Sequence, residues 1–323
     1  ARSARYVRLA RALDRPQSGA LGTPRPAPTP PVAVRPRSLS ITEIETLIRD
    51  PYAIYARHVL KLRALDDIGL KPDRALRGTL IHDALGKFTE RFQGGITGDA
   101  EAALAEIGDT ILAAVAEFPE IHAVWRHRFA QVARWFLDWE RERDGTVARR
   151  HAETRGAWTF DAPAGPFTLK GRADRIDVMA DGSIAIYDFK TGSPQTEKTI
   201  YAGLTPQLTL EAAMVRAGAF SDVTSSPGKS VSELAWLAIG RIGRGDPYLR
   251  AVNRGDTPDA AADKATELFR ALIFAFDNPD HPYLSRTRPM LERYPGEYDH
   301  LARAREWALV ESGDDYAVAG IAR

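Results

Sequence analysis

The chain has 323 residues, of which 44% are hydrophobic and 27% are charged, the composition of an ordinary globular protein. It has no cysteine, which excludes disulfides, thiolate zinc sites and an iron-sulfur cluster held by this chain. No segment approaches the roughly 18 apolar residues of a membrane span, and the basic N-terminus lacks the apolar core of a secretory signal. We therefore expect a cytoplasmic protein without a membrane partner.

The formal net charge of +1 hides an uneven distribution of charge. Residues 1–37 carry eight arginines and one aspartate, which leaves 36 basic and 42 acidic residues in the rest of the chain. The larger part is therefore acidic, which excludes a generally basic nucleic-acid-binding protein. Any nucleic acid would have to bind in a local groove.

The first 37 residues differ in composition from the rest. Residues 1–15 predict a short Arg-rich helix, and residues 16–36 hold seven of the 21 prolines, which is typical of a semi-rigid extended linker. Because the sequence begins with Ala and not Met, we expect residues 1–37 to be a linker from an upstream domain. The predicted domain covers residues 38–323, with a helical part at 38–145, a sheet core at 146–240 and C-terminal helices and a tail at 241–323.

Helical periodicity dominates residues 38–145. Ser40 and Glu43 form a capping box before an apolar run, which Asp50-Pro51 interrupts because the residue before a proline avoids the α region. Further amphipathic helices are predicted at residues 74–92, 99–118 and 121–144. The last helix carries tryptophans beside arginines, which could stack on bases. Their helical spacing with neighbouring phenylalanines favours core packing instead.

The helix predicted at residues 74–92 carries one histidine of interest. Gly78 and Gly86 lie four residues before and after His82, so the three share one face of the helix. Each glycine costs a helix about 1 kcal/mol, which indicates that another segment approaches the backbone closely. By itself His82 is more often a packing residue than a metal ligand or an active-site donor.

After Gly145 the apolar period changes from 3.6 to 2, which predicts a strand at residues 147–160 and a hairpin within residues 171–191. Asp181-Gly182 is the turn signal of this hairpin. A three-residue loop at 180–182, ending in a left-handed Gly182, pairs Val178 with Ile184 and Ile176 with Ile186.

The same register places Asp174 opposite Asp188, on one face with Lys190. A two-residue loop would instead place Asp174 opposite Phe189 and on the other face, and the apolar matching favours the first register. Two close carboxylates repel unless a cation or a proton lies between them. Carboxylate oxygens with few other ligands suit Mg²⁺ or Mn²⁺, and a neighbouring lysine can orient or help deprotonate a water molecule.

Two further polar residues and several later elements are predicted. Glu153 is either another acid near the site or part of a solvated strand face. Gln207 begins a helix after Pro206 and could bond a phosphate or the lysine. A strand at residues 232–239, a helix at 258–276 and a short helix at 300–307 complete the pattern.

The motifs occur in an order that is found in a known family. In this chain the order is Gly78 and His82, then Gly171-Arg172-Ala173-Asp174-Arg175-Ile176-Asp177, then Asp188-Phe189-Lys190-Thr191, and then Gln207. This set resembles the RecB-type branch of the PD-(D/E)xK nucleases. The run from Leu39 to Glu45, with Asp50-Pro51-Tyr52, narrows the resemblance to the C-terminal nuclease domain of the AddB subunit of alphaproteobacterial AddAB helicase-nucleases. The resemblance covers residues 35 to about 283.

The resemblance implies a fold, a site and a cofactor. The fold is α/β, with a restriction-endonuclease-like core, a central mixed sheet flanked by helices, and an added N-terminal helical region. His82, Asp174, Asp188 and the Phe189 backbone carbonyl resemble ligands of Mg²⁺ or Mn²⁺. Lys190 resembles the catalytic lysine, which acts with Asp174, Asp188 and the motif glutamine Gln207.

The chain departs from the family pattern at two positions. Members with an iron-sulfur cluster have a cysteine where this chain has Asp50, and further cysteines near the C-terminus, so no cluster is expected here. Many relatives have a tyrosine four residues after the glutamine, where this chain has Glu211. Only a peripheral role depends on that second position.

The resemblance also implies a metal-dependent DNA exonuclease domain that hydrolyses phosphodiester bonds during recombinational repair of double-strand breaks. Its implied partners are an AddA-type helicase-nuclease subunit and a single-stranded DNA end threaded from a helicase, in a bacterial, nucleoid-associated setting. One rival is a catalytically silent nuclease fold that binds DNA or docks a subunit. A second rival is a free-standing RecB-like exonuclease.

Overall fold

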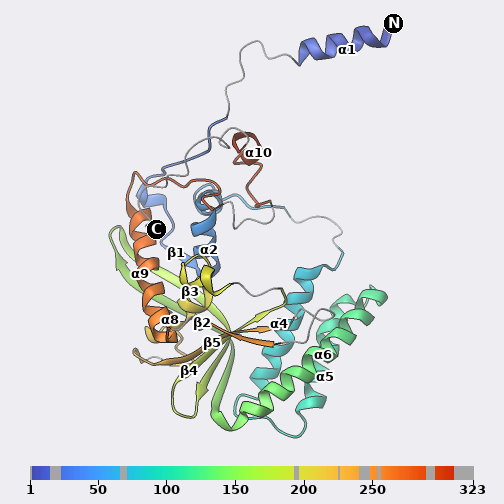
Figure 1. Cartoon of the computed structure of the whole chain (residues 1–323), viewed down its shortest axis with the longest axis vertical. Helices are drawn as coiled ribbons and strands as arrows, with labels where there is room; N and C mark the ends of the chain where they lie inside the picture. Colours follow the sequence, from blue (N-terminus) through green and yellow to red (C-terminus); the bar gives the residue numbers. More distant parts are fainter. Residues whose placement is uncertain are drawn as a thin grey trace.

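The computed structural model describes residues 2–14, 23–65, 71–192, 196–224, 226–239, 248–252, 256–288 and 295–308. It shows an α/β architecture in which helices flank a central mixed sheet (Figure 1), as the sequence predicted. Among the described residues, no helix is long and apolar enough to cross a membrane.

Within the described residues, the sheet has six strands in the order β1-β3-β4-β5-β6, with β2 paired along the other edge of β3. The strands are β1 (Ser38–Ser40), β2 (Val147–Ala162), β3 (Gly165–Met179), β4 (Ile184–Lys190), β5 (Val231–Ala238) and β6 (Tyr248–Ala251). The pairs β1–β3 and β4–β5 are parallel and the other pairs are antiparallel. The short strands β1 and β6 were not predicted, since three or four residues show too little alternation.

The register of the β3–β4 hairpin is confirmed. Val178 pairs with Ile184 and Ile176 with Ile186, and Gly182 has the left-handed φ of +83° that closes a three-residue loop. The Asp181 carboxylate accepts a hydrogen bond of 2.9 Å from the Ser183 backbone N–H and fixes the turn. The hairpin therefore follows the expected register as far as the pair Arg175–Tyr187, and the predicted pair Asp174–Asp188 lies one step beyond the ladder.

One edge of β3 pairs with two different strands along its length. The ladder to β1 ends at the pair Ser40–Lys170, and the ladder to β4 begins at Arg175–Tyr187. Within the part of the chain that the structure describes, residues 171–174 have no ladder partner on this edge. The sheet therefore opens where Asp174 lies.

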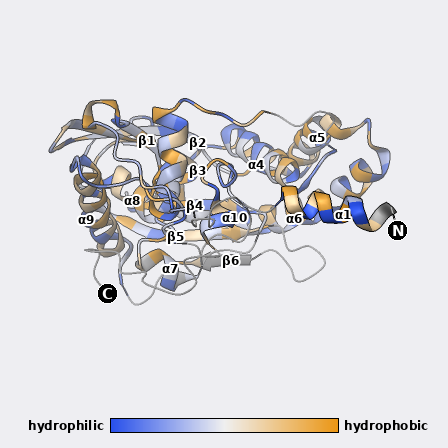
Figure 2. Cartoon of the chain, turned by 90° about the horizontal axis from the view of Figure 1, so that it is seen from above, coloured by the Kyte–Doolittle hydropathy of each residue, from blue (hydrophilic) through white to orange (hydrophobic). Residues whose placement is uncertain are grey.

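One face of the sheet is covered by the helical layer α4 (Arg74–Arg91), α5 (Ala100–Leu112) and α6 (Pro119–Arg143), with the 3-10 turns η3 (Ala113–Val115) and η4 (Asp144–Thr146). Trp125, Phe129 and Phe136 are buried, which confirms that the aromatic stripe packs in the core. These helices carry hydrophobic and hydrophilic residues on different sides (Figure 2). The layer packs against Tyr187 and Phe189 of β4.

The other face is covered by α2 (Ile41–Arg49), α8 (Gln207–Arg216) and α9 (Pro258–Asp277). The predicted capping box of Ser40 and Glu43 is present, and α2 ends before Pro51. Ile184 and Ile186 of β4 point to this core, so alternate residues of β4 belong to opposite faces. The remaining elements are α1 (Arg2–Leu13), η1 (Val32–Val34), α3 (Pro51–Ile54), the π-turn η2 (Tyr55–Val59), α7 (Glu197–Tyr201) and α10 (Ala304–Trp307).

The described part of the Pro-rich segment contacts the end of α9 and the residues that follow it. The Tyr283 N–H donates to the Pro28 carbonyl at 2.9 Å, and Arg35 donates to the carbonyls of Phe276, Asn278 and Pro279. Residues 15–22 of the predicted linker lie outside the described residues. The domain boundaries stay a prediction.

Candidate active site

The predicted site residues come from four elements. Asp174 lies at the opening in β3, Asp188 and Lys190 end β4, His82 is midway along α4, and Gln207 begins α8. The structure brings these five side chains together through a chain of contacts.

Asp174 is held by one helix and one strand. Its Oδ2 lies 3.3 Å from Nδ1 of His82 and accepts a hydrogen bond of 2.9 Å from the Phe189 backbone N–H. The Phe189 ring packs edge-on against the His82 ring, with 5.6 Å between their centroids. Phe189 therefore orients both an acid and the histidine, whereas the predicted role of its carbonyl stays a prediction.

Lys190, Asp188 and Gln207 form a second group. Lys190 Nζ lies 2.7 Å from Asp188 Oδ2 and donates a hydrogen bond of 3.1 Å to Gln207 Oε1. The Gln207 amide in turn donates to Asp188 Oδ1. Of the two partners considered for Gln207, the structure therefore shows the lysine, and Asp188 in addition.

The glycines of α4 allow the close approach that the sequence indicated. A Cβ added to Gly78 would lie 2.9 Å from Oγ1 of Thr191, and one added to Gly86 would lie 3.2 Å from Cγ of Glu153. Both distances are shorter than ordinary contacts, so α4 lies directly against the end of β4 and against β2. This packing sets the height of His82 above the sheet.

Glu153 lies closer to the site than a solvated strand face would. Its backbone has a left-handed φ of 52°, which is rare for a residue other than glycine, and its carboxylate pairs with the Arg172 guanidinium at 2.5 Å. Burial and the charge of Asp174 raise the pKa of Glu153. The structure therefore favours the interpretation of Glu153 as an acid near the site.

The pKa values of the two aspartates are shifted in opposite directions. Burial, together with the charge of Asp174, raises the pKa of Asp188 to about 6 although Lys190 opposes the shift. Burial also acts to raise the pKa of Asp174, but the His82 hydrogen bond and charge outweigh it, so that pKa is lowered. The pKa of His82 is raised because the attraction of Asp174 exceeds the effect of burial. An added positive charge between Asp174 and Asp188 would therefore be favourable.

Glu211 is a buried acid that the sequence interpretation placed at the periphery. Its side chain is 1% exposed, and its Oε2 has no hydrogen-bond partner among the described residues. Burial and the charges of Asp188 and Asp174 raise the pKa of Glu211 well above its usual value. The sequence signal that could have placed Glu211 at the site is its position four residues after Gln207, which puts both side chains on one face of α8.

The donor set fits a hard divalent cation in its chemistry. Asp174 and Asp188 supply carboxylate oxygens and His82 a ring nitrogen, and buried Asp188 Oδ2 accepts no well-aligned hydrogen bond despite the nearby Lys190. In their present positions, however, no three His, Asp or Glu side chains of the described ranges surround one point. His82 and Asp174 contact each other instead.

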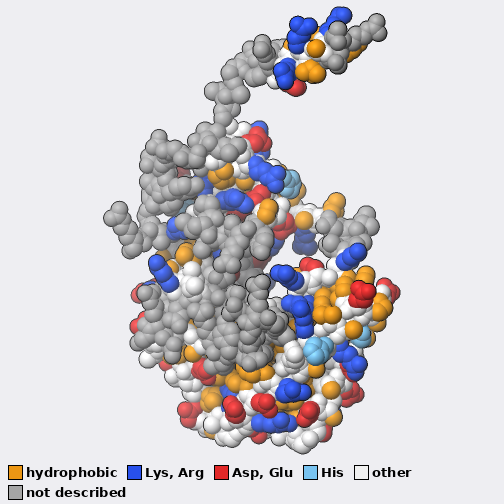
Figure 3. All heavy atoms as spheres, turned by 45° about the vertical axis from the view of Figure 1, so that its right-hand side comes forward, with side chains coloured by type: hydrophobic (Ala, Val, Ile, Leu, Met, Phe, Trp, Pro, Cys, Tyr) orange, Lys and Arg blue, Asp and Glu red, His pale blue; other side chains and the backbone are white. Residues whose placement is uncertain are grey.

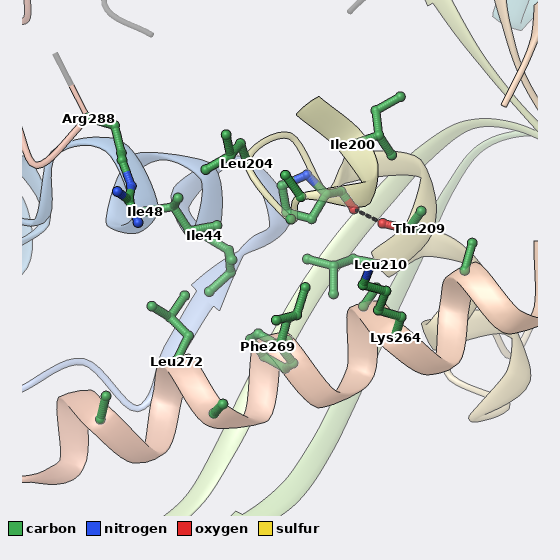
Figure 4. A pocket seen from close by; sticks show the side chains of 18 residues that line it. Ile44, Ile48, Ile200, Leu204, Thr209, Leu210, Lys264, Phe269, Leu272 and Arg288 are labelled. Carbon is green, nitrogen blue, oxygen red and sulfur yellow. Dashed lines mark hydrogen bonds between the residues drawn. The ribbon is translucent and has the colours of Figure 1, made fainter. Parts of the chain in front are cut away.

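An apolar pocket of about 270 Å³ lies away from these acids, between α2, α9 and the loop before α8. Figure 4 shows Ile44, Leu272 and Phe269 pointing into it. None of the described side chains that line this pocket is acidic, so they offer no carboxylate ligand for a metal, and the pocket is not the candidate active site.

Comparison with known proteins gives the family. A family model described as the PD-(D/E)XK nuclease superfamily matches residues 38–310. An uncharacterized protein of Rickettsia bellii is 32% identical over 256 residues, which is 77% of this chain and 31% of that protein. The uncharacterized protein RC0550 of Rickettsia conorii is 32% identical over 59% of this chain and 23% of its own length.

The chain therefore spans about a quarter to a third of the length of these two relatives. A solved structure titled "Crystal structure of SSO0001" aligns with 82% of this chain and 83% of its own, at 12% identity and a TM-score of 0.29. Nucleases of the matched superfamily generally use divalent metal ions such as Mg²⁺. With the family model covering most of the sequence, the chain belongs to the PD-(D/E)XK nuclease superfamily.

Proposed function

We propose that this chain is a metal-dependent DNA nuclease domain that hydrolyses phosphodiester bonds. The observation that carries the proposal is the complete set of Asp174, Asp188, Lys190 and Gln207 at the opening of the sheet. A catalytically silent relative would be expected to lack one of these groups.

The side chains divide the work by charge. The ion pair with Asp188 outweighs burial and raises the pKa of Lys190, so its ammonium form is favoured at neutral pH. That form stabilises the negative charge that develops on the phosphate, and Gln207 holds it in place. Asp174 and Asp188, with His82, are the residues that would hold the cation. A bound divalent cation supplies Lewis-acid stabilisation and lowers the pKa of water.

Basic side chains of the helical layer support a polyanionic substrate. Burial and the neighbouring charges of Arg128 and Arg74 lower the pKa of Arg77, one residue before Gly78 on α4. None of these three arginines has an ion pair with another described residue. Figure 3 shows Lys and Arg side chains gathered on the face beside the helical layer. Phosphate groups are the natural counterions for such a cluster.

The finer proposal is that this is the nuclease domain of an AddB-type subunit. The ordered motifs of the sequence support it, as does the short share of the curated relatives that the chain spans. The proposed partner is an AddA-type helicase-nuclease subunit, and the proposed role is exonucleolytic processing of double-strand breaks for recombination. A single DNA strand delivered by the helicase would then be the substrate.

The test is cleavage of labelled single-stranded and duplex DNA by the purified chain with Mg²⁺ or Mn²⁺ and with chelator. We expect metal-dependent cleavage by the wild type, and a loss of at least about a thousandfold in Lys190→Ala and Asp188→Ala. Lys190→Ala removes the ammonium that stabilises the charge on the reacting phosphate, and Asp188→Ala removes one of the carboxylates that would hold the cation. Lys229→Ala is the matched control. Lys229 is exposed, and its neighbour Ser230 bonds Ile184 at the opposite end of β4.

Folding of each variant is checked by thermal unfolding. Cleavage that persists undiminished in both active-site variants would contradict the proposal, and so would a preparation in which Lys229→Ala loses as much activity as Lys190→Ala. A folded wild-type chain that neither cleaves DNA nor binds a divalent cation would favour the silent docking module.

A further inference from the structure

The apolar pocket between α2, α9 and the loop before α8 lies outside the candidate active site and is not used by the proposed nuclease function. Its longest wall is a stripe of α9. The residues of this stripe that line the pocket are Ala261, Lys264, Ala265, Leu268, Phe269, Ala271, Leu272 and Ala275. They recur at the spacing of one helix face. From Ala261 to Ala275, at about 1.5 Å per residue, the stripe is roughly 20 Å long.

Part of this stripe is open to solvent and is already held in place. Leu268 is 38% exposed, although it lines the pocket beside buried Phe269. Gly203 of the loop before α8 has a left-handed φ of +70°, and a Cβ added to it would lie 2.8 Å from Cδ1 of Leu268. The loop therefore packs directly against Leu268. A wall that is ordered in advance loses little conformational entropy when a partner binds.

The charged side chains among the described residues that line the pocket are both positive. Figure 4 shows Arg288 beside Ile48 at one end and Lys264 near Leu210 at the other. Neither cation forms an ion pair with another residue of described position. The buried Nε of Arg288 has no hydrogen-bond partner among the described residues. A buried donor of this kind costs free energy until an acceptor meets it.

The size and shape of the pocket favour inserted side chains over a whole small molecule. Its volume of about 270 Å³ is below the roughly 300–1,000 Å³ of sites that enclose small ligands. A long, partly exposed apolar stripe is the arrangement that receives an amphipathic helix, with anchors at positions i, i+4 and i+7. Cations at both ends suit a helix that carries acids at both ends of its apolar face.

Two occupants from this chain itself fit the charge poorly. The helix α1 (Arg2–Leu13) has exposed apolar residues but carries four arginines and no acid, so it would place positive charge against Lys264 and Arg288. A second copy docked through the same face would bring two cationic pockets together. Like charges juxtaposed across an interface cost affinity. The charge therefore indicates a different, acidic partner.

We propose that the apolar pocket docks an amphipathic helix of a partner protein. Apolar side chains of that helix fill the space between α9 and α2, and acidic side chains at its two ends meet Lys264 and Arg288. The partner is defined by this chemistry alone. The proposal does not depend on the nuclease function, because the candidate active-site residues are not among those that line the pocket.

The experiment measures the binding of two designed helical peptides that differ only in their end charges. Both carry leucines at positions i, i+4, i+7 and i+11, and one has glutamates and the other lysines at its ends. Fluorescence anisotropy of the fluorescein-labelled peptides with the full chain should show micromolar binding of the acidic peptide and at least roughly tenfold weaker binding of the basic one. Equal affinities would overturn the proposal, and so would a lack of binding up to about 1 mM.

Two substitutions on α9 form a matched pair. Leu268→Asp places a charge in the wall of the pocket and should weaken binding of the acidic peptide at least about tenfold. Phe274→Asp is the control and should bind like the wild type, because Phe274 is 44% exposed on the same helix and does not line the pocket. Both side chains are exposed, so both variants should fold, which thermal unfolding checks. Equal effects of the two substitutions would overturn the assignment to the pocket.

A charge reversal tests the ends of the pocket. Lys264→Glu should weaken binding of the acidic peptide and strengthen binding of the basic one, each by about threefold or more. The same change for both peptides would contradict the role of Lys264. DNA cleavage should be unchanged in Leu268→Asp, so a failure of the docking proposal and a failure of the nuclease proposal are separate results.

Two other occupants would be recognised by the same variant, and either would overturn the proposal. Anilinonaphthalene sulfonate is a small apolar anion. Binding of this dye more tightly than the acidic peptide, with loss of the binding in Leu268→Asp, would identify a small-molecule site. A wild-type dimer in sedimentation equilibrium that Leu268→Asp dissociates would identify a second copy of the chain.

Discussion

Two groups of buried charges meet on β3 and differ in their balance of cations and acids. The first group is the arginine network, defined as Arg143, Arg150 and Arg175 with Glu140, Asp144 and Asp177. Arg175 lies 2.7 Å from Glu140 and also pairs with Asp177, while Arg150 lies 2.9 Å from Glu140. Arg143 and Arg150 each pair with a further acid. Three cations therefore meet three acids.

The candidate active-site cluster, which includes Asp174 next to Arg175, is not balanced. Among the described residues, Asp174, Asp188 and Glu211 share one ammonium, that of Lys190, and the ring of His82. The consequence appears in the pKa of Asp188, which burial and Asp174 raise to about 6, whereas the arginines of the network hold the pKa of Asp177 below its usual value despite burial. Buried cations and acids in equal number stabilise the fold, whereas an excess of buried acids favours the binding of an added cation.

The largest effect should come from breaking the arginine network. Arg175 is 0% exposed and packs between Glu140 and Asp177, so Arg175→Met leaves two acids buried without their main partner. We expect a loss of about 3–5 kcal/mol in the free energy of unfolding, measured by urea denaturation. A loss below about 1 kcal/mol would show that the arginine network does not stabilise the fold.

Neutralising an acid of the candidate active site should instead raise the free energy of unfolding. Without divalent cation at pH 8, Asp188→Asn removes a carboxylate whose pKa is raised to about 6 by burial and by the charge of Asp174, which corresponds to a gain on the order of 1–3 kcal/mol in stability. Urea denaturation checks this gain, and DNA cleavage should be lost in the same variant. Destabilisation comparable with that of Arg175→Met would contradict the distinction between the two groups.

The pH dependence should separate the groups as well. A raised carboxyl pKa means that the folded state binds the extra proton, so the contribution of Asp188 is favourable below about pH 4 and is lost as the pH rises through about 6. The lowered pKa of Asp177 acts in reverse, and its contribution is lost only as the pH falls below the usual carboxyl range. The stability difference between wild type and Asp188→Asn should therefore vanish near pH 4 and grow toward pH 7, as measured by denaturation at each pH.

The smallest effect on stability is expected at the contact that sets the height of His82. Gly78→Ala gains about 1 kcal/mol of helix propensity but places its Cβ 2.9 Å from Thr191 Oγ1, so the net change should stay within about 1 kcal/mol. Displacing the end of β4 should lower cleavage roughly tenfold. Gly98→Ala, which meets no atom within 4 Å, is the control and should keep full activity.

The sequence allowed some of this to be predicted because local signals were strong. Asp181-Gly182 and the matched isoleucines determined the hairpin register, and the glycine spacing around His82 indicated a close approach that the structure confirms. The arginine network could not be anticipated, because Arg175 of β3 pairs both with Asp177 of its own strand and with Glu140 of α6, which lies far earlier in the chain. The left-handed backbone of Glu153 has no sequence signal either, since tertiary packing imposes it.

Glu211 shows where a departure from a family pattern carried information. Its position was judged peripheral because relatives have tyrosine there, yet its carboxyl group is buried beside Gln207. Burial of that acid depends on how α8 packs against the sheet, which spacing along the helix does not reveal. The opening of β3 between β1 and β4 was hidden for a similar reason, because β1 has only three residues.

The most direct test is the location of a bound cation in a crystal of the wild-type chain soaked in Mn²⁺. The account predicts an anomalous-difference peak within coordination distance of the Asp174 and Asp188 carboxylates and the His82 ring, and no peak at the arginine network. The same peak should be absent from Asp188→Asn crystals. A wild-type crystal with Mn²⁺ bound elsewhere, and none between Asp174 and Asp188, would contradict the claim that these incompletely paired acids form a metal site.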